Sequence, residues 1–225
     1  MLRKYEKTYR IVTPDFRVKG KLNLSSKDQK KLLNGKVEIT EKVDGANVGI
    51  VRTKNDSWTL QKRRGLADSG VHEQFAFFWN WARNNEERIL KIPEGHIVYG
   101  ELCFAVHHIF YDQLPSYFLV YDIWDGRGYL DHSERVSLVD DLGFNHVPIL
   151  HYGSLDGILE LEKLVGQSKL SSSVLMEGVV VKNYRKQARG KLVRPEFVKE
   201  LNEGDHWMKF NVRRNRLQEG VQWDD

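Results

Sequence analysis

A lysine in the segment EKVDGAN, residues 41–47, is the first candidate for a reactive side chain. The segment lies between the strand-like stretches VEIT and VGIVRT, so a tight corner between two strands presents Lys42, and Gly45 lets the backbone turn closely. A lysine amine is a nucleophile only when it is deprotonated, which requires burial or a neighbouring cation that lowers its pKa. The alternative is a plain β-hairpin with a turn at Asp44 and Gly45 and a solvated lysine.

Further charged segments follow along the chain in a definite order. They are QKRRG (61–65), VYGEL (98–102), FLVYDIW (118–124), MEGVVVK (176–182) and GKLVRPEF (190–197). Two of these apolar strands carry a glutamate beside a glycine, Glu101 and Glu177. A buried carboxylate is costly without a partner such as a sugar hydroxyl or a hydrated metal ion. A strand-end salt bridge explains either glutamate alone, but both together with the lysine corner and the basic last strand favour a functional site.

As an ordered set, KVDG, GE, YDIW, EGVVVK and KLVRP resemble the nucleotidyltransferase motifs I, III, IIIa, IV and V, which RNA ligases, DNA ligases and mRNA capping enzymes share. With Asn47 in EKVDGAN, KRRG after the second strand and VRPEF near the end, the chain is most similar to ATP-dependent RNA ligases of the bacteriophage type-2 kind and their small bacterial relatives. The resemblance covers residues 37–217. In the C-terminal part, the residues that resemble those relatives are His206, Trp207, Asn215, Arg216 and Leu217.

The resemblance implies a three-step reaction. Lys42 attacks the α-phosphorus of ATP and pyrophosphate leaves, the AMP passes from the lysine to the 5′-phosphate of a strand, and a 3′-hydroxyl then displaces AMP. The expected catalytic residues are Lys42, Lys182 and Lys191, and the expected nucleotide-binding residues are Glu41, Asn47, Arg63, Glu101, Tyr121, Glu177 and Arg194.

The resemblance gives the charged residues their expected roles. Negative charge gathers on the phosphate oxygens in each displacement, and nearby cations stabilise it. Lys182 and Lys191 are expected at the α-phosphate, and Arg63 is expected to hold the nucleotide and its phosphates. Glu101 is expected to accept from a ribose hydroxyl, and Glu177 to orient a hydrated divalent ion, Mg²⁺ or Mn²⁺.

The other expected contacts are with the base and the RNA end. Tyr121 would stack on adenine, because a planar ring offers contact area without polar cost, while Glu41 would recognise the adenine edge and Asn47 would place the RNA end. Motif V of the type-2 ligases has two lysines separated by one residue, whereas here Lys191 is followed by LVR. Alternation along a strand sets Arg194 opposite Lys191, so we expect Lys191 in catalysis and Arg194 in a structural or RNA-facing role.

Strand-like segments outnumber helical ones. The former are 37–40, 48–53, 58–61, 96–101, 117–124, 178–182 and 191–194, and the latter are 25–33, 74–85, 133–142 and 154–168. Without a regular β-α-β alternation, the order predicts an α+β fold of antiparallel sheets packed against helices. We expect an adenylyltransferase domain over residues 1–199 and an extension over residues 200–225 that contacts RNA. The stretch after Arg194 is too short for the five strands of an OB-fold barrel.

Composition narrows the class of protein. With 225 residues, 40% hydrophobic and 29% charged, the chain is typical of a soluble globular protein, and no run approaches the ~20 apolar residues of a membrane span. A single cysteine, Cys103, excludes an internal disulfide framework and a cysteine-based zinc cluster, and it fits a reducing cytoplasm. The net charge of +4 is compatible with a polyanionic partner.

Three further features have a plain structural interpretation. Adjacent His107 and His108 point to opposite faces of a strand, which favours polar packing or substrate contact over a shared metal. The aromatic run 75–81 has helical spacing and is interpreted as core rather than as a base-stacking platform. The cluster 213–216 is either a solvated tail or a nucleic-acid contact.

Two alternatives to an RNA ligase stay open. A minimal DNA ligase shares the same five motifs, but Asn47 and the expected lack of an OB-fold favour RNA with 3′-hydroxyl and 5′-phosphate ends as the substrate. A non-catalytic nucleic-acid-binding module could keep the fold, although it would have no need of the intact lysines and glutamates. The RNA ligase interpretation also allows an RNA end-healing enzyme as a partner.

Overall fold

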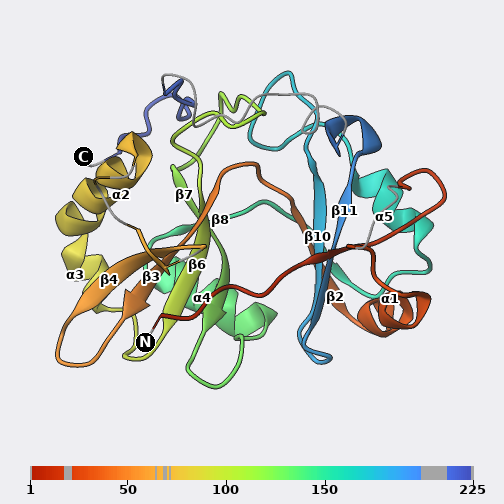
Figure 1. The fold of residues 1–225 in the computed structure, drawn as a ribbon, viewed down its shortest axis with the longest axis horizontal. Coiled ribbons are helices and arrows are strands. Elements are labelled where there is room, and N and C mark those ends of the chain that lie inside the picture. Colours follow the sequence, from red (N-terminus) through yellow and green to blue (C-terminus); the bar gives the residue numbers. More distant parts are fainter. Residues whose placement is uncertain are drawn as a thin grey trace.

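The computed structural model describes residues 2–17, 22–63, 65–67, 70, 72–198 and 212–223. Its strands form two sheets that face each other (Figure 1). Sheet A has the order β1 (Tyr9–Arg10), β11 (Ala188–Val193), β10 (Gly178–Asn183), β2 (Val37–Glu41) and β9 (Ile149–Gly153). Sheet B has the order β5 (Gly65–Leu66), β4 (Trp58–Lys62), β3 (Ala46–Arg52), β6 (Ile97–Leu102), β7 (Phe118–Trp124) and β8 (Asn145–His146). Strands β1 and β8 pair in parallel with their neighbours, and the other pairs are antiparallel.

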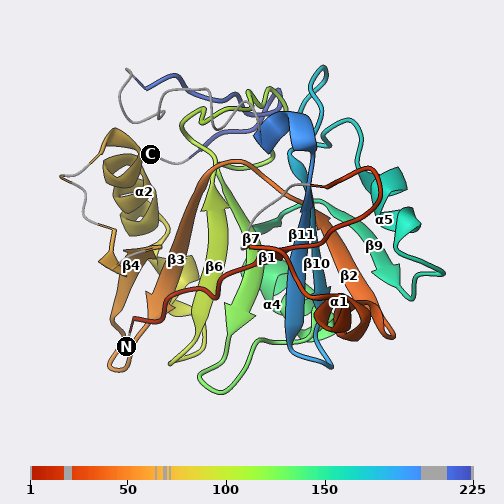
Figure 2. The same cartoon turned by 45° about the vertical axis from the view of Figure 1, so that its right-hand side comes forward.

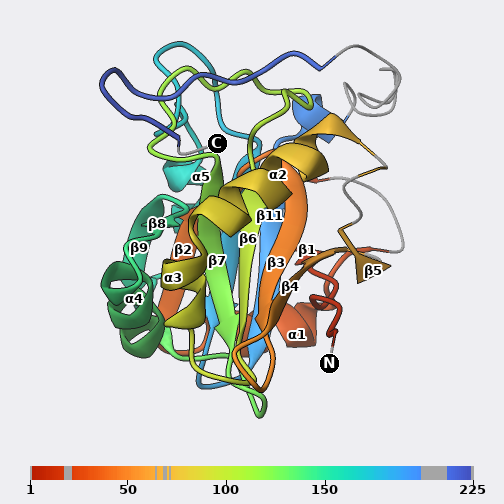
Figure 3. The same ribbon diagram turned by 90° about the vertical axis from the view of Figure 1, so that its left-hand side faces the viewer.

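The helices are α1 (Ser26–Leu33), α2 (Glu73–Asn84), α3 (Glu86–Leu90), α4 (His132–Asp141) and α5 (Leu159–Leu164). Helices α2 and α3 cover the outer side of sheet B, and α1 and α5 cover that of sheet A. Helix α4 lies at the edge between the two sheets, where its Arg135 contacts Glu38 of β2 (Figure 1). Helix α2 crosses the strands of sheet B, and its fully buried Phe78 and nearly buried Trp81 belong to the apolar core there (Figure 3). Helices α1 and α5 place Leu32 and Leu161 in the core of sheet A. The predicted α+β class and the core role of the aromatic run are confirmed.

Local signals fix several helix boundaries. The Ser25 side chain accepts from the backbone N–H of Asp28 and caps α1, as expected of a serine at this position. Helix α4 begins with a capping box between Asp131 and Glu134. The helix expected over 154–168 forms only from Leu159 to Leu164 and has no side-chain cap at its start.

The lysine corner connects the two sheets. Strand β2 pairs with β9 and β10 in sheet A, whereas β3 pairs with β4 and β6 in sheet B. Residues 42–45 therefore cross from one sheet to the other (Figure 2). The hairpin alternative for this segment is wrong, because the strands on its two sides do not pair with each other.

The C-terminal segment 212–223 returns across sheet B. Arg214 forms an antiparallel bridge with Ala105, and Leu217 a parallel bridge with Leu114. Trp223 stacks on Trp81 of α2 with ring centroids 4.7 Å apart. Within the described residues the strands close no barrel. No described helix has the length and apolarity that a membrane span requires.

Candidate active site

Lys42 and Glu177 form an ion pair where the chain leaves sheet A. The Lys42 Nζ lies 2.6 Å from Glu177 Oε2, and the two side chains are 22% and 7% exposed. The Lys42 N–H donates to the Gly178 carbonyl at 2.9 Å, which continues the β2–β10 pairing and aligns the two side chains. A Cβ on Gly178 would lie 2.0 Å from the Leu192 carbonyl oxygen, so only glycine can follow Glu177 here.

Asp44 attaches the same corner to the loop after β6. Its carboxylate accepts from the backbone N–H groups of His108 and Ile109 at 2.7 and 3.0 Å, and its own N–H donates to the Tyr111 hydroxyl at 2.8 Å. A Cβ on Gly45 would lie 2.6 Å from the Leu102 carbonyl oxygen. The backbone beside Lys42 is therefore held against sheet B as well as sheet A.

Three carboxylates surround the lysine and change its protonation. Burial raises the pKa of Glu101 to about 8, and the neighbouring Asp44 and Glu177 act in the same direction. Burial also raises the pKa of Glu177. Burial by itself would lower the pKa of Lys42, but Glu177 and then Glu101 outweigh it, so the Lys42 pKa is raised. The lowered pKa expected of a nucleophilic lysine is therefore wrong for the chain without a bound nucleotide.

Side chains from three strands of sheet B face this corner. Asn47 of β3 lies opposite Glu101 of β6 in the strand register. On the next strand the register shifts, with Tyr99 opposite Asp122 and Gly100 opposite Val120, so Tyr121 is an extra residue in β7. The Tyr121 hydroxyl accepts a hydrogen bond from the Asn47 amide. Three of the expected nucleotide-binding residues, Asn47, Glu101 and Tyr121, thus lie together.

Lys182 lies deeper between the sheets, in a buried charge network. It is 4% exposed, donates to the Tyr121 carbonyl and lies 3.7 Å from a Glu38 oxygen and 3.6 Å from an Asp122 oxygen. Burial lowers its pKa. The network ties Lys182 of sheet A to β7 of sheet B, and its expected contact with the α-phosphate stays a prediction.

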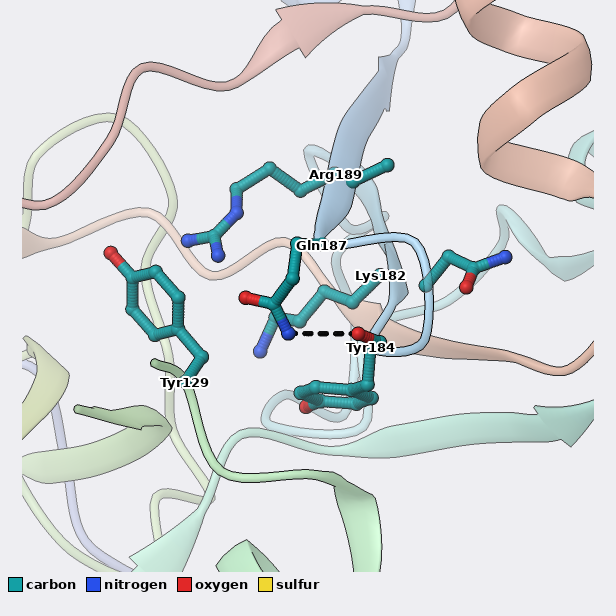
Figure 4. Close-up of a pocket in the computed structure, with 7 residues that line it drawn as sticks. Tyr129, Lys182, Tyr184, Gln187 and Arg189 are labelled. Atoms are coloured by element: carbon teal, nitrogen blue, oxygen red, sulfur yellow. Dashed lines mark hydrogen bonds between the residues drawn. The ribbon is translucent and has the colours of Figure 1, made fainter. Parts of the chain in front are cut away.

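A small pocket opens at the end of β10 remote from Glu177. Its lining includes Tyr129, Lys182, Tyr184, Gln187 and Arg189, and the Lys182 and Arg189 side chains extend toward Tyr129 (Figure 4). The Gln187 amide donates to the Tyr184 carbonyl at 2.8 Å, and the Arg189 guanidinium lies 3.9 Å from the centre of the Tyr129 ring. None of the other expected site residues lines this pocket.

Lys191 lies within electrostatic reach of the Lys42–Glu177 pair. Burial and then Lys42 lower the pKa of Lys191 to about 8, with smaller contributions in the same direction from Arg10 and Arg63. Arg194 is bonded to the segment before β10, because its Nε donates to the Met176 carbonyl at 2.6 Å. The roles expected for Lys191 and Arg194 stay predictions.

Glu41 faces away from Lys42. It is 1% exposed, and its carboxylate accepts from the Ser168 hydroxyl and from the Lys169 N–H at 2.8 Å. These contacts anchor the loop before β10. In the structure the Glu41 carboxylate binds the loop at Ser168 and Lys169. Its expected contact with adenine stays a prediction.

Sequence reasoning missed two groups of the site. Asp44 was interpreted only as a turn residue, although it joins the lysine corner to the loop at His108. Tyr5, far away in the sequence, donates to Asp122 at 2.6 Å and packs edge-on against Tyr121 with centroids 4.9 Å apart. No described group of three or more His, Cys, Asp or Glu side chains could hold a metal ion by itself.

Two facing sheets joined by a crossover that carries Lys42 thus form the candidate site. The family model described as RNA ligase matches residues 35–211, and the chain belongs to this family. No individual curated protein matches the chain. Residues 199–211, which include His206 and Trp207, lie within the matched range but outside the described residues.

Solved RNA ligases of Naegleria gruberi share the fold. The structure with pyrophosphate has a TM-score of 0.68 and 25% identity, and the match covers 90% of this chain and 59% of that one. A variant with ATP and Mn has a TM-score of 0.60 and 24% identity, covering 86% and 61%. A variant with AMP and Mn has a TM-score of 0.62 and 22% identity, covering 88% and 62%. The chain thus spans less than two thirds of the length of these ligases.

Proposed function

We propose that this chain is an ATP-dependent RNA ligase that joins 3′-hydroxyl and 5′-phosphate ends, with Lys42 as the nucleophile. The deprotonated Nζ bonds to the α-phosphorus of ATP while the bond to pyrophosphate breaks. An oxygen of the RNA 5′-phosphate then takes the AMP and frees the lysine. Finally a 3′-hydroxyl attacks that 5′-phosphate, loses its proton and expels AMP. A reaction that leaves 3′-hydroxyl and 5′-phosphate ends must precede the sealing, so an end-healing enzyme is an expected partner.

The observation that carries the proposal is the 2.6 Å contact between Lys42 and Glu177 at the crossover between the sheets. Burial raises the pKa values of Glu101 and Glu177, which means that their negative charges are poorly solvated. A divalent cation would stabilise the charged form of such carboxylates. Glu177 is the residue that would hold hydrated Mg²⁺ or Mn²⁺, since Mg²⁺ needs only one or two carboxylates and keeps most of its waters. A bound ion would supply positive charge to the phosphates, and a Naegleria gruberi RNA ligase variant has been solved with ATP and Mn.

The protonation of Lys42 follows from which charges surround it. While Glu177 neutralises the ammonium, the lysine keeps its proton. With a divalent cation held by Glu177, burial and the positive charge of Lys191 would favour the neutral amine. Lys191 and Arg63 would then stabilise the charge on the α-phosphate, with Tyr121 at the base and Asn47 at the RNA end.

The test is incubation with ATP labelled at the α-phosphate and Mg²⁺ or Mn²⁺, followed by denaturing electrophoresis. We expect an acid-labile, base-stable label on the chain, because amine attack gives a phosphoramidate. Lys42→Arg should abolish the label, since a guanidinium stays protonated. The matched control is Lys54→Arg in the exposed β3–β4 turn, which should label fully. A label that persists on Lys42→Arg would disprove the nucleophile.

A further inference from the structure

Two arginines of the C-terminal segment lie over one aromatic ring. The guanidinium carbons of Arg213 and Arg216 are 4.7 and 5.7 Å from the centre of the Phe110 ring, and both arginines are exposed. We propose that these three residues, the arginine platform, bind the sugar–phosphate backbone of the RNA strand that enters the cleft. The inference rests on the proposed function, because it names the surface that holds the substrate of that site.

The platform is built on a fixed backbone. Asn215, which is 2% exposed, donates to the Cys103 carbonyl and accepts from the Tyr111 N–H, both at 2.8 Å. The backbone N–H of Arg216 also donates to the Tyr111 carbonyl at 2.8 Å. A buried asparagine with both ends of its amide bonded fixes the segment, so binding a ligand costs little ordering of the backbone.

The platform is also connected to the nucleophile. Phe110 directly follows Ile109, whose N–H donates to Asp44, and Asp44 is two residues beyond Lys42. The C-terminal segment and the β2–β3 crossover lie at the same end of the molecule in two perpendicular views (Figures 1 and 3). The platform and the Lys42 corner thus belong to one connected end of the molecule, as a surface that holds the substrate of that site requires.

The charges of the platform are suited to phosphate. Among the described residues neither Arg213 nor Arg216 forms an ion pair, and both side chains are exposed to solvent. Arg214 differs, because its guanidinium lies 3.1 Å from Glu73 of α2 and 4.7 Å from the Phe104 ring centre. A guanidinium binds phosphate through parallel N–H donors, and stacking on an aromatic ring holds its plane in place.

The experiment measures binding of a fluorescein-labelled, 5′-phosphorylated single-stranded RNA by anisotropy over a range of salt concentrations. Each phosphate contact contributes about 0.7 to the slope of log affinity against log salt for a single strand. We expect Arg213→Ala/Arg216→Ala to lower the slope by about 1.4, which is a loss of about 25-fold in affinity at 0.1 M salt relative to the 1 M limit. Arg214→Ala, on the same segment, should keep the wild-type slope.

A second variant guards against misfolding. Arg213→Lys/Arg216→Lys keeps both charges, so it should keep most of the slope while losing part of the affinity that stacking and bidentate contact provide. A wild-type slope in the double alanine variant would overturn the proposal, as would an equal loss in Arg214→Ala. Labelling of Lys42 with AMP is scored separately, so a chain that binds RNA through the platform but takes no AMP would refute the proposed function and leave the platform standing.

Discussion

Replacing Glu177 with glutamine removes the charge that neutralises Lys42 and keeps the shape of the side chain. Breaking a fully buried ion pair costs about 3–5 kcal/mol. Lys42 is 22% exposed and the amide oxygen can still accept from its ammonium, so we expect about 2 kcal/mol. For a chain of this size each kcal/mol lowers the melting temperature by roughly 2–4 °C, which predicts a decrease of about 4–8 °C.

The same change should alter the chemistry of Lys42 in two opposite ways. Burial lowers the pKa of Lys42, and Glu177 is the strongest of the groups that raise it. Without that charge the pKa falls, so the amine should react faster with an acylating reagent. Transfer of AMP to Lys42 should become slower, because Glu177 can no longer hold the divalent ion. The expected signature of the lost charge is therefore a pair of opposite effects, faster acylation of Lys42 and slower transfer of AMP to it.

Competitive labelling with acetic anhydride at pH 8, read by mass spectrometry, measures the first effect. The exposed Lys54 in the same preparation provides the reference for an ordinary amine. Formation of enzyme–AMP from labelled ATP measures the second effect, and Glu94→Gln at an exposed turn is the matched control that should change neither. The reasoning is refuted if Glu177→Gln takes AMP at the wild-type rate, or if its Lys42 is acetylated no faster than in the wild type.

Two further predictions concern the neighbouring residues of sheet B. Asn47→Ala should still form enzyme–AMP but seal pre-adenylylated RNA slowly in single-turnover assays; sealing at the wild-type rate would leave Asn47 only its contact with Tyr121. The folded chain holds a proton on Glu101 up to pH about 8, whereas the unfolded chain releases it near 4.5, so this residue lowers stability as pH rises between those values. Glu101→Gln should lack that decrease, on the order of a few kcal/mol, in thermal unfolding from pH 5 to pH 8; parallel pH curves for the two chains would contradict it.

The sequence predicts the local parts of this fold well. The strand-like stretches around Lys42, Glu101 and Glu177 form strands, and Ser25 caps the helix that follows it. Prediction fails where local signals are weak. Strand β9, Ile149–Gly153, has no clean alternation of exposed and buried residues, and the two-residue β1 exists only because β11 lies beside it.

The sequence predicts which residues form the site better than it predicts the pKa shifts of those residues. The ordered motifs predict that Lys42, Glu101 and Glu177 belong to one site, and in the structure the two glutamates lie near the lysine. The sign of the Lys42 pKa change depends on the distance to a carboxylate 135 residues away along the chain, which no local pattern encodes. The same holds for Tyr5, whose contact with Asp122 spans 117 residues.

The crossover position of Lys42 has a consequence for how the cleft can work. Its backbone is bonded to Gly178 of sheet A, and two residues later Asp44 is bonded to His108 in the loop between β6 and β7 of sheet B. A change in the angle between the sheets would move Glu101 relative to Glu177, while the nucleophile stays attached to both sides. We infer that small motions of the sheets could separate Lys42 from Glu177, and loss of that carboxylate is the change that would lower the pKa of Lys42.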